Sequence, residues 1–244
     1  MRDWAGKRYW VVGASEGLGR ALCAAMSRAG AHLVLSARDR ARLEDLAAEL
    51  PGPTTVAPCD ISDDASVKEA AAQAGDLDGV VFLAGVYWPQ AAQDWNADQV
   101  TAMCDINFTG LARVLGQAVP PMVAKDAGHI VITGSLSGFR GLPGSIGYTA
   151  SKAGTMSMAE SMQCDLRKTG VAVQVINPGF IRTRLTDKNE FAMPFIMDPE
   201  PAAQVMFEFM QTNRFKLSFP TLFSWVFRGS QFLPDGLYFR LFGR

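Results

Sequence analysis

Tyr148 and Lys152 lie four residues apart in the stretch Tyr148-Thr-Ala-Ser-Lys152, a spacing at which two side chains can serve one chemical site. On a helix, residues at i and i+4 share a face. A phenol is a poor acid near neutral pH, and a neighbouring ammonium favours its ionised form and lowers its pKa from about 10. The pair is therefore a candidate general acid/base. A core tyrosine beside a solvated lysine would show the same spacing.

The composition is that of a globular protein without a strong charge. The 244 residues are 48% hydrophobic and 19% charged, and the formal net charge is -1. Such a chain is long enough to bury a substantial core. Because no basic excess is present, we expect no nucleic acid as a partner.

The cysteines are scattered, with no CxxC pair and no histidine nearby in the sequence, so we expect neither a disulfide framework nor a metal site. Residues 1–7 carry three charges and run directly into a strand-like segment, which is unlike a signal peptide. No apolar run approaches the roughly 20 residues that span a bilayer. These features predict a cytoplasmic protein.

A glycine-rich turn follows the first predicted strand. Residues 8–13 form a short apolar run, the sequence Gly13-Ala-Ser-Glu-Gly17-Leu-Gly19 comes next, and an alanine-rich helix extends to Arg28. A strand, glycine-rich turn and helix in this order present backbone N–H groups to a pyrophosphate. The expected cofactor contacts here are Gly13, Ser15, Glu16, Gly17, Leu18 and Gly19.

The end of the second predicted strand, residues 31–37, bears on the choice of nicotinamide cofactor. NAD sites usually place an acidic residue there for the ribose 2′-hydroxyl, whereas this chain has Ser36-Ala37-Arg38. A guanidinium can bind a 2′-phosphate, so Ser36 and Arg38 predict NADP(H) in preference to NAD(H). The alternative is that Arg38 joins Arg40 and Arg42 at a solvated helix start.

Strands and helices alternate along most of the chain. After the second strand we expect helices at 40–50, 63–74, 98–122, from Tyr148 onward and 200–211, and strands at 54–57, 77–85, 129–133, 171–176 and 215–219. This alternation predicts an α/β fold, a three-layer doubly wound Rossmann-like domain over residues 1–244 with a central parallel sheet of about seven strands.

Small and polar residues recur where these strands end, at the sheet edge where ligands bind in such folds. They are Asp60 and Ile61, Ala84 and Gly85, and Pro178, Gly179, Ile181 and Thr183. We expect all of them to contact the cofactor.

These motifs, in this order, resemble the short-chain dehydrogenase/reductase family, in its shorter single-domain branch. The resemblance covers residues 7–183: the glycine turn is similar to TGxxxGxG, Asp60 to an adenine-binding Asp, Ala84-Gly85 to NNAG and residues 178–183 to PGxxxT. The chain departs from the pattern at Val12 and at Phe82-Leu83. The resemblance also implies a catalytic tetrad of Asn107, Ser135, Tyr148 and Lys152, with Ser137 as the alternative serine.

The resemblance implies hydride transfer between the nicotinamide and a carbonyl or alcohol. Tyr148 would exchange the proton, Ser135 would hydrogen-bond the same oxygen, Lys152 would lower the pKa of Tyr148 and hold the ribose, and Asn107 would place a relay water. The cofactor would contact Asn107, Tyr148 and Lys152. A homodimer or homotetramer is implied as well. The alternatives are a non-catalytic NADP-binding sensor or scaffold protein and a sugar-nucleotide epimerase, which normally has a longer chain.

Two C-terminal segments are expected to determine the substrate. Residues 183–200 lack regular periodicity and are rich in Met and Phe, which indicates a loop over a hydrophobic small-molecule substrate. Residues 215–244 form an aromatic-rich extension. If 221–233 is helical, Ser224, Arg228 and Gln231 share a narrow face and apolar side chains cover the rest. This extension would pack on the core, line the substrate pocket, form a subunit interface, or attach weakly to a membrane surface.

Overall fold

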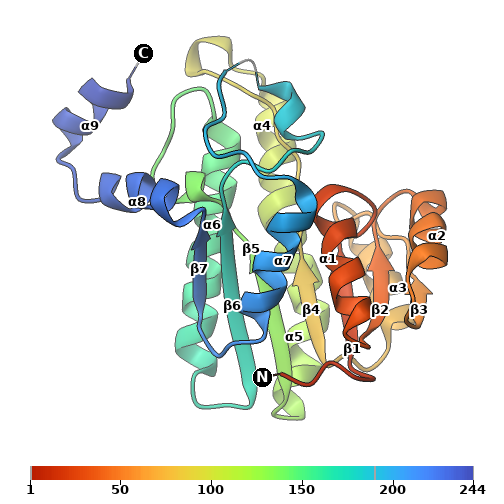
Figure 1. The fold of residues 1–244 in the computed structure, drawn as a ribbon. Coiled ribbons are helices and arrows are strands. Elements are labelled where there is room, and N and C mark those ends of the chain that lie inside the picture. Colours follow the sequence, from red (N-terminus) through yellow and green to blue (C-terminus); the bar gives the residue numbers. More distant parts are fainter. Residues whose placement is uncertain (1, 190, 244) are drawn as a thin grey trace.

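Seven strands pair side by side, all parallel, in one central sheet (Figure 1). The structure is a computed structural model that describes residues 2–189 and 191–243. The strand order is β3-β2-β1-β4-β5-β6-β7, which confirms the predicted doubly wound α/β fold. The strands are β1 (Arg8–Val12), β2 (His32–Ser36), β3 (Thr54–Val56), β4 (Gly79–Phe82), β5 (Gly128–Thr133), β6 (Val171–Pro178) and β7 (Lys216–Phe219).

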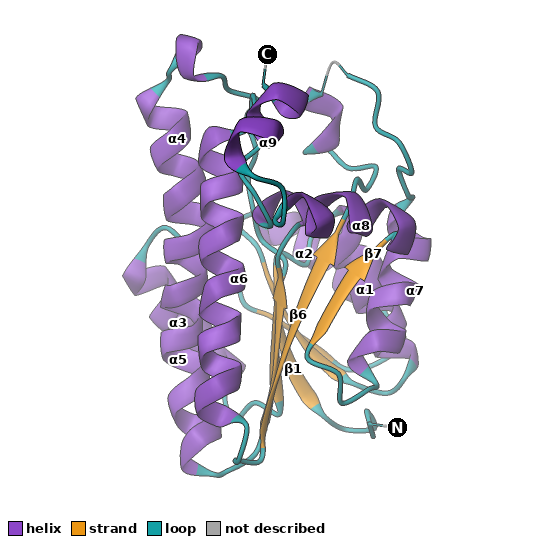
Figure 2. Ribbon diagram, turned by 90° about the vertical axis from the view of Figure 1, so that its left-hand side faces the viewer, coloured by secondary structure: helices purple, strands orange, loops and turns teal. Residues whose placement is uncertain are grey.

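Helices cover both faces of the sheet (Figure 2). They are α1 (Gly17–Arg28), α2 (Arg40–Glu49), α3 (Asp64–Ala74), α4 (Ala97–Cys104), α5 (Gly110–Ala124), α6 (Ile146–Leu166), α7 (Pro199–Met210), α8 (Thr221–Ser230) and α9 (Asp235–Phe242). Side chains of α1, α2 and α7 pack in one core, and those of α3, α5 and α6 pack in the other. Within the described residues, no helix has the length and apolarity needed to cross a membrane.

Successive residues of a strand enter opposite cores. Trp10 and Val12 of β1 pack under α3, α5 and α6, whereas Tyr9 and Val11 pack under α1, α2 and α7. Because both faces are covered, neither set of side chains is polar. This explains why the strand sequences are continuous apolar runs rather than alternating ones.

The sheet reverses its strand order between β1 and β4. The chain passes from β1 outward to β2 and β3, and then crosses back so that β4 lies on the other side of β1. In doubly wound sheets, ligands bind in the crevice outside the carboxyl ends of the strands at this point. The turns that follow β1 and β4 therefore face each other across the crevice.

The helix expected at 98–122 differs from the prediction in one respect. It is divided into α4 and α5 by a π-helical turn at Asp105–Thr109, which contains Asn107. One additional residue in a helical turn redirects the side chains that follow, and such turns often occur at functional sites. The apolar periodicity on which the prediction depended does not reveal a single inserted residue.

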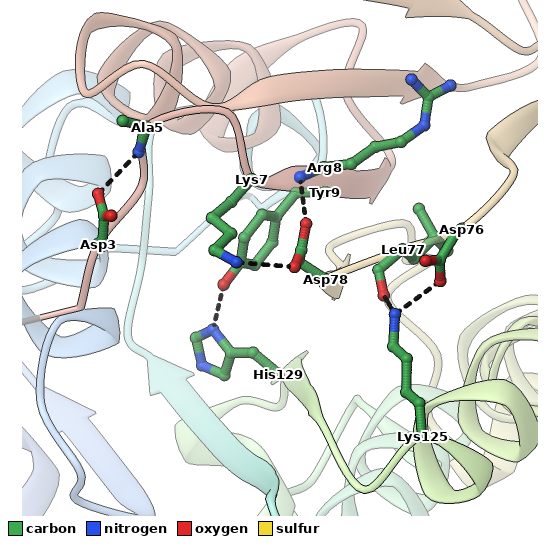
Figure 3. A network of polar contacts seen from close by, with 10 residues as sticks. All are labelled: Asp3, Ala5, Lys7, Arg8, Tyr9, Asp76, Leu77, Asp78, Lys125 and His129. Carbon is green, nitrogen blue, oxygen red and sulfur yellow. Dashed lines mark hydrogen bonds and ion pairs between the residues drawn. The ribbon is translucent and has the colours of Figure 1, made fainter.

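Polar contacts tie the amino ends of the strands together, at the edge opposite the crevice (Figure 3). The Asp78 carboxylate accepts hydrogen bonds from the Arg8 backbone N–H at 2.9 Å and from Lys7 Nζ at 3.2 Å. Lys125 donates to the Asp76 carboxylate at 2.6 Å and to the Leu77 carbonyl at 2.8 Å. These contacts join β1 and the end of α5 to the segment that leads into β4.

His129 lies buried at the same edge, between two polar side chains. Its Nδ1 is 2.9 Å from the Tyr9 hydroxyl, and its Nε2 is 2.9 Å from Gln174 Oε1. The Gln174 amide nitrogen donates to carbonyls of residues 209, 212 and 214, which leaves its oxygen to accept from the imidazole. In a neutral ring with its proton on Nε2, Nε2 donates to Gln174 and Nδ1 accepts from the Tyr9 hydroxyl. Each of these polar atoms then has a hydrogen-bond partner. Burial, with Arg2 nearby, lowers the pKa of His129 to about 3.

We predict that His129 makes the protein less stable in acid. Between about pH 6.5 and pH 3 the unfolded chain binds a proton that folded His129 does not, so the free energy of unfolding falls as the pH falls. From about pH 7.5 to about pH 5, this one group should lower the free energy of unfolding by about 2 kcal/mol. Denaturant titrations should show a smaller loss over this interval in His129→Gln. The control is His32→Gln, at the half-buried histidine, and an equal effect of both substitutions would contradict the assignment.

Candidate active site

Two glycines allow the turn after β1 to approach β4 and α1 closely. Gly13 has φ +95°, and a Cβ there would lie 2.6 Å from the Ala84 backbone nitrogen. A Cβ on Gly19 would lie 1.9 Å from the carbonyl oxygen of Gly13. Any larger residue would therefore displace backbone, because these atoms cannot turn aside as a side chain can. The glycine spacing in the sequence reflects these two contacts.

The N-terminus of α1 has no side-chain cap. Side chains of Asp39, Asp63 and Asn96 cap α2, α3 and α4, whereas Glu16 at the start of α1 makes no capping hydrogen bond. The first backbone N–H groups of α1 therefore remain available to a ligand. Together with the positive end of the helix dipole, they form a site suited to a phosphate group.

Two arginines neutralise Glu16. The Glu16 carboxylate is 3.0 Å from Arg42 Nη1 and also pairs with Arg184. Without these partners a carboxylate at this position would repel a phosphate. Neither pairing was predicted from the sequence, since Arg184 is distant along the chain and nothing in its local pattern indicates a partner in the glycine turn.

One cavity of about 320 Å³ opens at the switch point between β1 and β4. Most residues expected to bind a cofactor line it: Gly13, Ser15, Glu16, Gly17, Leu18, Gly19, Arg38, Asp60, Ile61, Ala84, Gly85, Tyr148, Lys152, Pro178, Gly179, Ile181 and Thr183. Arg42, Thr133 and Arg184 also line it, and sequence reasoning had not included them. The basic side chains around Arg38 were a usable signal for Arg42, but Thr133 contributes its backbone and has no sequence signal.

Ser36 does not line this cavity, in contrast to the prediction. It is fully buried, where its hydroxyl accepts from Trp10 Nε1 at 2.8 Å and donates to the Ala57 carbonyl. Its own carbonyl accepts from the backbone N–H groups of Gly13 and Ala14. Ser36 therefore holds the glycine turn through backbone hydrogen bonds and offers no group to a ligand. Its place before Arg38 had suggested otherwise, but Ser36 still belongs to β2, where both faces of the sheet are covered.

Tyr148 and Lys152 face the cavity together from α6. Lys152 Nζ lies 5.8 Å from the centre of the Tyr148 ring and donates a 3.0 Å hydrogen bond to the Thr133 carbonyl at the end of β5. Ser135 follows β5, and its hydroxyl accepts from both the backbone N–H and the hydroxyl of Ser137, at 3.2 and 2.9 Å. Ser137 thus orients Ser135, an arrangement in which the two serines have different roles.

The pKa of Tyr148 differs in direction from the sequence-based expectation. Burial raises the pKa of Tyr148 to about 12, although a hydrogen bond with Ser135 acts in the opposite sense. Burial also lowers the pKa of Lys152 to about 8, and its ammonium is directed to the Thr133 carbonyl. The expectation considered only the neighbouring charge, whereas burial is the largest cause of both pKa changes. The phenol is consequently protonated at neutral pH.

Asn107 lies behind the cavity, and its side chain is fully buried. Its Oδ1 accepts from the Val86 N–H at 2.7 Å, and its Nδ2 donates to the Val86 carbonyl at 2.9 Å and to Ser151 Oγ at 3.1 Å. A Cβ on Gly85 would lie 3.2 Å from Asn107 Oδ1 and 3.9 Å from Lys152 Nζ. Asn107 thus holds the chain after β4 against α6, beside Lys152.

An aromatic cluster lies beside the cavity, formed by the segments expected to determine the substrate. Phe223 of α8 has its ring centre 5.7 Å from Phe180, 5.6 Å from Phe195 and 5.0 Å from Phe227. A Cβ on Gly179, which lines the cavity, would be 3.3 Å from the Phe223 ring. Part of the C-terminal extension therefore packs against a residue that lines the cavity, without lining the cavity itself.

The chain matches a family model described as short chain dehydrogenase over residues 7–193. It is 37% identical to a protein of Myxococcus xanthus named "Uncharacterized oxidoreductase", over 98% of this chain and 97% of that protein.

Two solved structures are similar in fold. One is a short chain dehydrogenase/reductase from Burkholderia phymatum in complex with NAD, with a TM-score of 0.85, 24% identity and coverage of 93% of this chain and 94% of that one. The other is an alcohol dehydrogenase from the archaeon Thermococcus sibiricus complexed with 5-hydroxy-NADP, with a TM-score of 0.77, 23% identity and coverage of 87% and 96%.

We predict that Gly19→Ala weakens nicotinamide cofactor binding by about tenfold or more, because the added methyl group displaces the Gly13 carbonyl. Alanine is the better helix former by about 1 kcal/mol, so helix propensity alone would produce no loss. The control is Gly116→Ala in α5, where a Cβ meets nothing within 4 Å. Fluorescence titration with reduced cofactor measures both, and unchanged binding in Gly19→Ala would refute the steric argument.

Proposed function

Because the chain belongs to the short-chain dehydrogenase family, we propose that it is an NADP(H)-dependent oxidoreductase acting on the carbonyl or alcohol group of a hydrophobic small molecule. The observation that carries the proposal is the convergence of Tyr148 and Lys152 with an uncapped, glycine-lined helix start on one cavity. The lining of the cavity fits the cofactor, since glycines leave room for a pyrophosphate and Arg38 is among the lining residues. When bound, the nicotinamide supplies or accepts the hydride.

The proposed catalytic residues are Tyr148, Ser135, Lys152 and Asn107. Tyr148 holds the proton for the substrate oxygen, and its raised pKa keeps that proton in place at neutral pH. Ser135 donates a hydrogen bond to the same oxygen and stabilises its developing charge. Lys152 holds the cofactor ribose, and Asn107 fixes the strand end beside Lys152. A protonated phenol suits the direction of carbonyl reduction.

We predict that Tyr148→Phe retains cofactor binding and lowers turnover by about 100-fold or more, because it removes only the proton donor. The matched control is Tyr87→Phe, since the Tyr87 ring packs edge-on against Tyr148 at 5.1 Å. NADPH absorbance with a panel of hydrophobic ketones and aldehydes measures both. Near-normal turnover in Tyr148→Phe would refute the catalytic role. Tight NADPH binding by the wild type without turnover of any carbonyl would favour a non-catalytic sensor or scaffold protein.

Arg38 supports the preference for NADP(H). It lines the cavity, is exposed, and makes no ion pair within residues 2–189 and 191–243. Arg40 instead pairs with Glu44, outside the main cavity, and Arg42 pairs with Glu16 and Asp39. The three arginines are therefore not equivalent, and Arg38 is the one free to bind a 2′-phosphate.

We predict that Arg38→Asp reverses the cofactor preference. The substitution removes a charged hydrogen bond worth about 1.5–3 kcal/mol and adds a carboxylate that repels a 2′-phosphate and can accept from a 2′-hydroxyl. The ratio of NADPH to NADH affinity should fall by about tenfold or more. Arg40→Asp is the control and should preserve the ratio. Tighter binding of NADH than NADPH by the unmutated protein would contradict the proposal.

The aromatic cluster supports a hydrophobic substrate, and the loop at 183–200 would cover it. We further propose a cytoplasmic homodimer or homotetramer, on the resemblance to the family.

A further inference from the structure

Exposed hydrophobic side chains are concentrated at one end of the molecule. Eleven large hydrophobic residues are exposed among the described residues, and only Trp95 and Val123 precede residue 191. The other nine are Phe191, Phe195, Leu222, Trp225, Val226, Phe232, Leu237, Phe239 and Leu241. Seven of the nine belong to the segment 221–243, which contains α8 and α9 and is called the arm below. Concentration of this kind marks an interaction surface rather than ordinary scatter.

The arm exposes apolar side chains on its outer side. Ser224 and Ser230 of α8 are buried, whereas Trp225 is 58% exposed and Leu222 is 77% exposed. The Gln231 amide turns inward and donates to the Phe139 carbonyl at 3.1 Å. Of the narrow polar face expected from the sequence, Ser224 lies against the protein, whereas Arg228 and Gln231 are exposed. The apolar side chains of α8 divide between an outer face and the inner aromatic cluster.

Specific contacts hold the arm in place. Arg140 forms an ion pair with Asp235 at 2.6 Å, donates to the Leu233 carbonyl at 2.8 Å, and lies 3.9 Å from the centre of the Tyr238 ring. The Tyr238 hydroxyl donates to the Gly141 carbonyl. The ribbon shows the arm projecting beyond the sheet near the carboxyl ends of the strands (Figures 1 and 2). Its outward apolar face is therefore a fixed feature of the fold.

The charged residues of the arm indicate which kind of surface its outer face can bind. Residues 221–243 contain two cations, Arg228 and Arg240, and one anion, Asp235, which Arg140 neutralises. Neither Arg228 nor Arg240 has an ion-pair partner in the described chain. The Arg228 guanidinium lies 4.4 Å from the centre of the Trp225 ring. Aromatic side chains with arginines beside them match the boundary between acyl chains and anionic headgroups.

We propose that the outer face of the arm docks on an anionic lipid surface. A second copy of the chain fits less well: in a two-fold interface the same patch meets itself, so each copy would bring two cations and no free carboxylate. The arm offers no uncompensated carboxylate to receive them, whereas phosphate headgroups would.

Docking would also place the aromatic cluster close to the membrane, and this part rests on the proposed function. The inner face of α8 carries Phe223 against Gly179 of the cavity, and its outer face carries Trp225 and Leu222. One helix thus separates the lipid from the aromatic cluster. A hydrophobic carbonyl compound that partitions into the bilayer would then be concentrated near the site.

Vesicle co-sedimentation of the full chain tests the docking without any measurement of turnover. The probes are vesicles of phosphatidylcholine alone and of phosphatidylcholine with phosphatidylglycerol. The wild type should sediment with the anionic vesicles and less with the neutral ones, and added salt should weaken the binding. The double substitution Trp225→Glu and Phe239→Glu should lower the bound fraction by about tenfold or more, because it removes buried apolar area.

Val123→Glu is the matched control, since Val123 is an exposed hydrophobic residue on α5, outside the arm. It should bind vesicles as the wild type does, and thermal melts should show that all variants fold. Arg228→Gln with Arg240→Gln should remove the preference for anionic vesicles. The proposal is overturned if the wild type does not sediment with vesicles. It is equally overturned if the double substitution changes only the sedimentation-velocity mass and leaves vesicle binding intact, which would identify a second copy as the occupant.

Discussion

The close approach of two backbone segments, the turn after β1 and the end of β4, is the constraint on which the rest of the site depends. Backbone N–H groups of Gly13 and Ala14 bond to the Ser36 carbonyl, and those of Leu83 and Ala84 bond to the Val12 carbonyl. The ends of β2, β1 and β4 are thereby locked together. Since Gly13 has no Cβ, the turn can pass over Ala84 and direct the start of α1 toward the crevice.

The site built on this contact has two halves with different physical demands. One half, at the glycine turn and the start of α1, offers backbone N–H groups and arginine side chains. A ligand needs space to approach these groups, and the glycines provide it. The other half consists of side chains on α6 and after β5, and its requirement is control of protonation. Gly85 joins the halves, because it is small enough to lie beside both Asn107 and Lys152. Desolvation raises the pKa of Tyr148, which stays protonated, and lowers the pKa of Lys152 below that of an exposed lysine.

The sequence predicts the fold well because parallel strands covered on both faces leave continuous apolar runs, and glycine turns mark their ends. Most residues that were expected to contact a cofactor line one cavity, since motifs at strand ends share one edge. Prediction from the sequence fails where the outcome depends on contacts between distant segments. Pairing of Glu16 with Arg184 and the desolvation of Tyr148 are of this kind, whereas the π turn at Asn107 is a local insertion that apolar periodicity does not reveal. The burial of Ser36 could have been inferred from its position within the second predicted strand, because strands of such a sheet are covered on both faces.

The two edges of the sheet have separate duties. The carboxyl edge carries the cavity, while the amino edge carries His129, Tyr9 and the Asp78 contacts, with whole strands between them. Substitutions that adjust acid tolerance at one edge therefore leave the geometry of the other untouched. Acid stability and ligand selectivity can therefore be engineered separately, the first at the amino edge of the sheet and the second at its carboxyl edge.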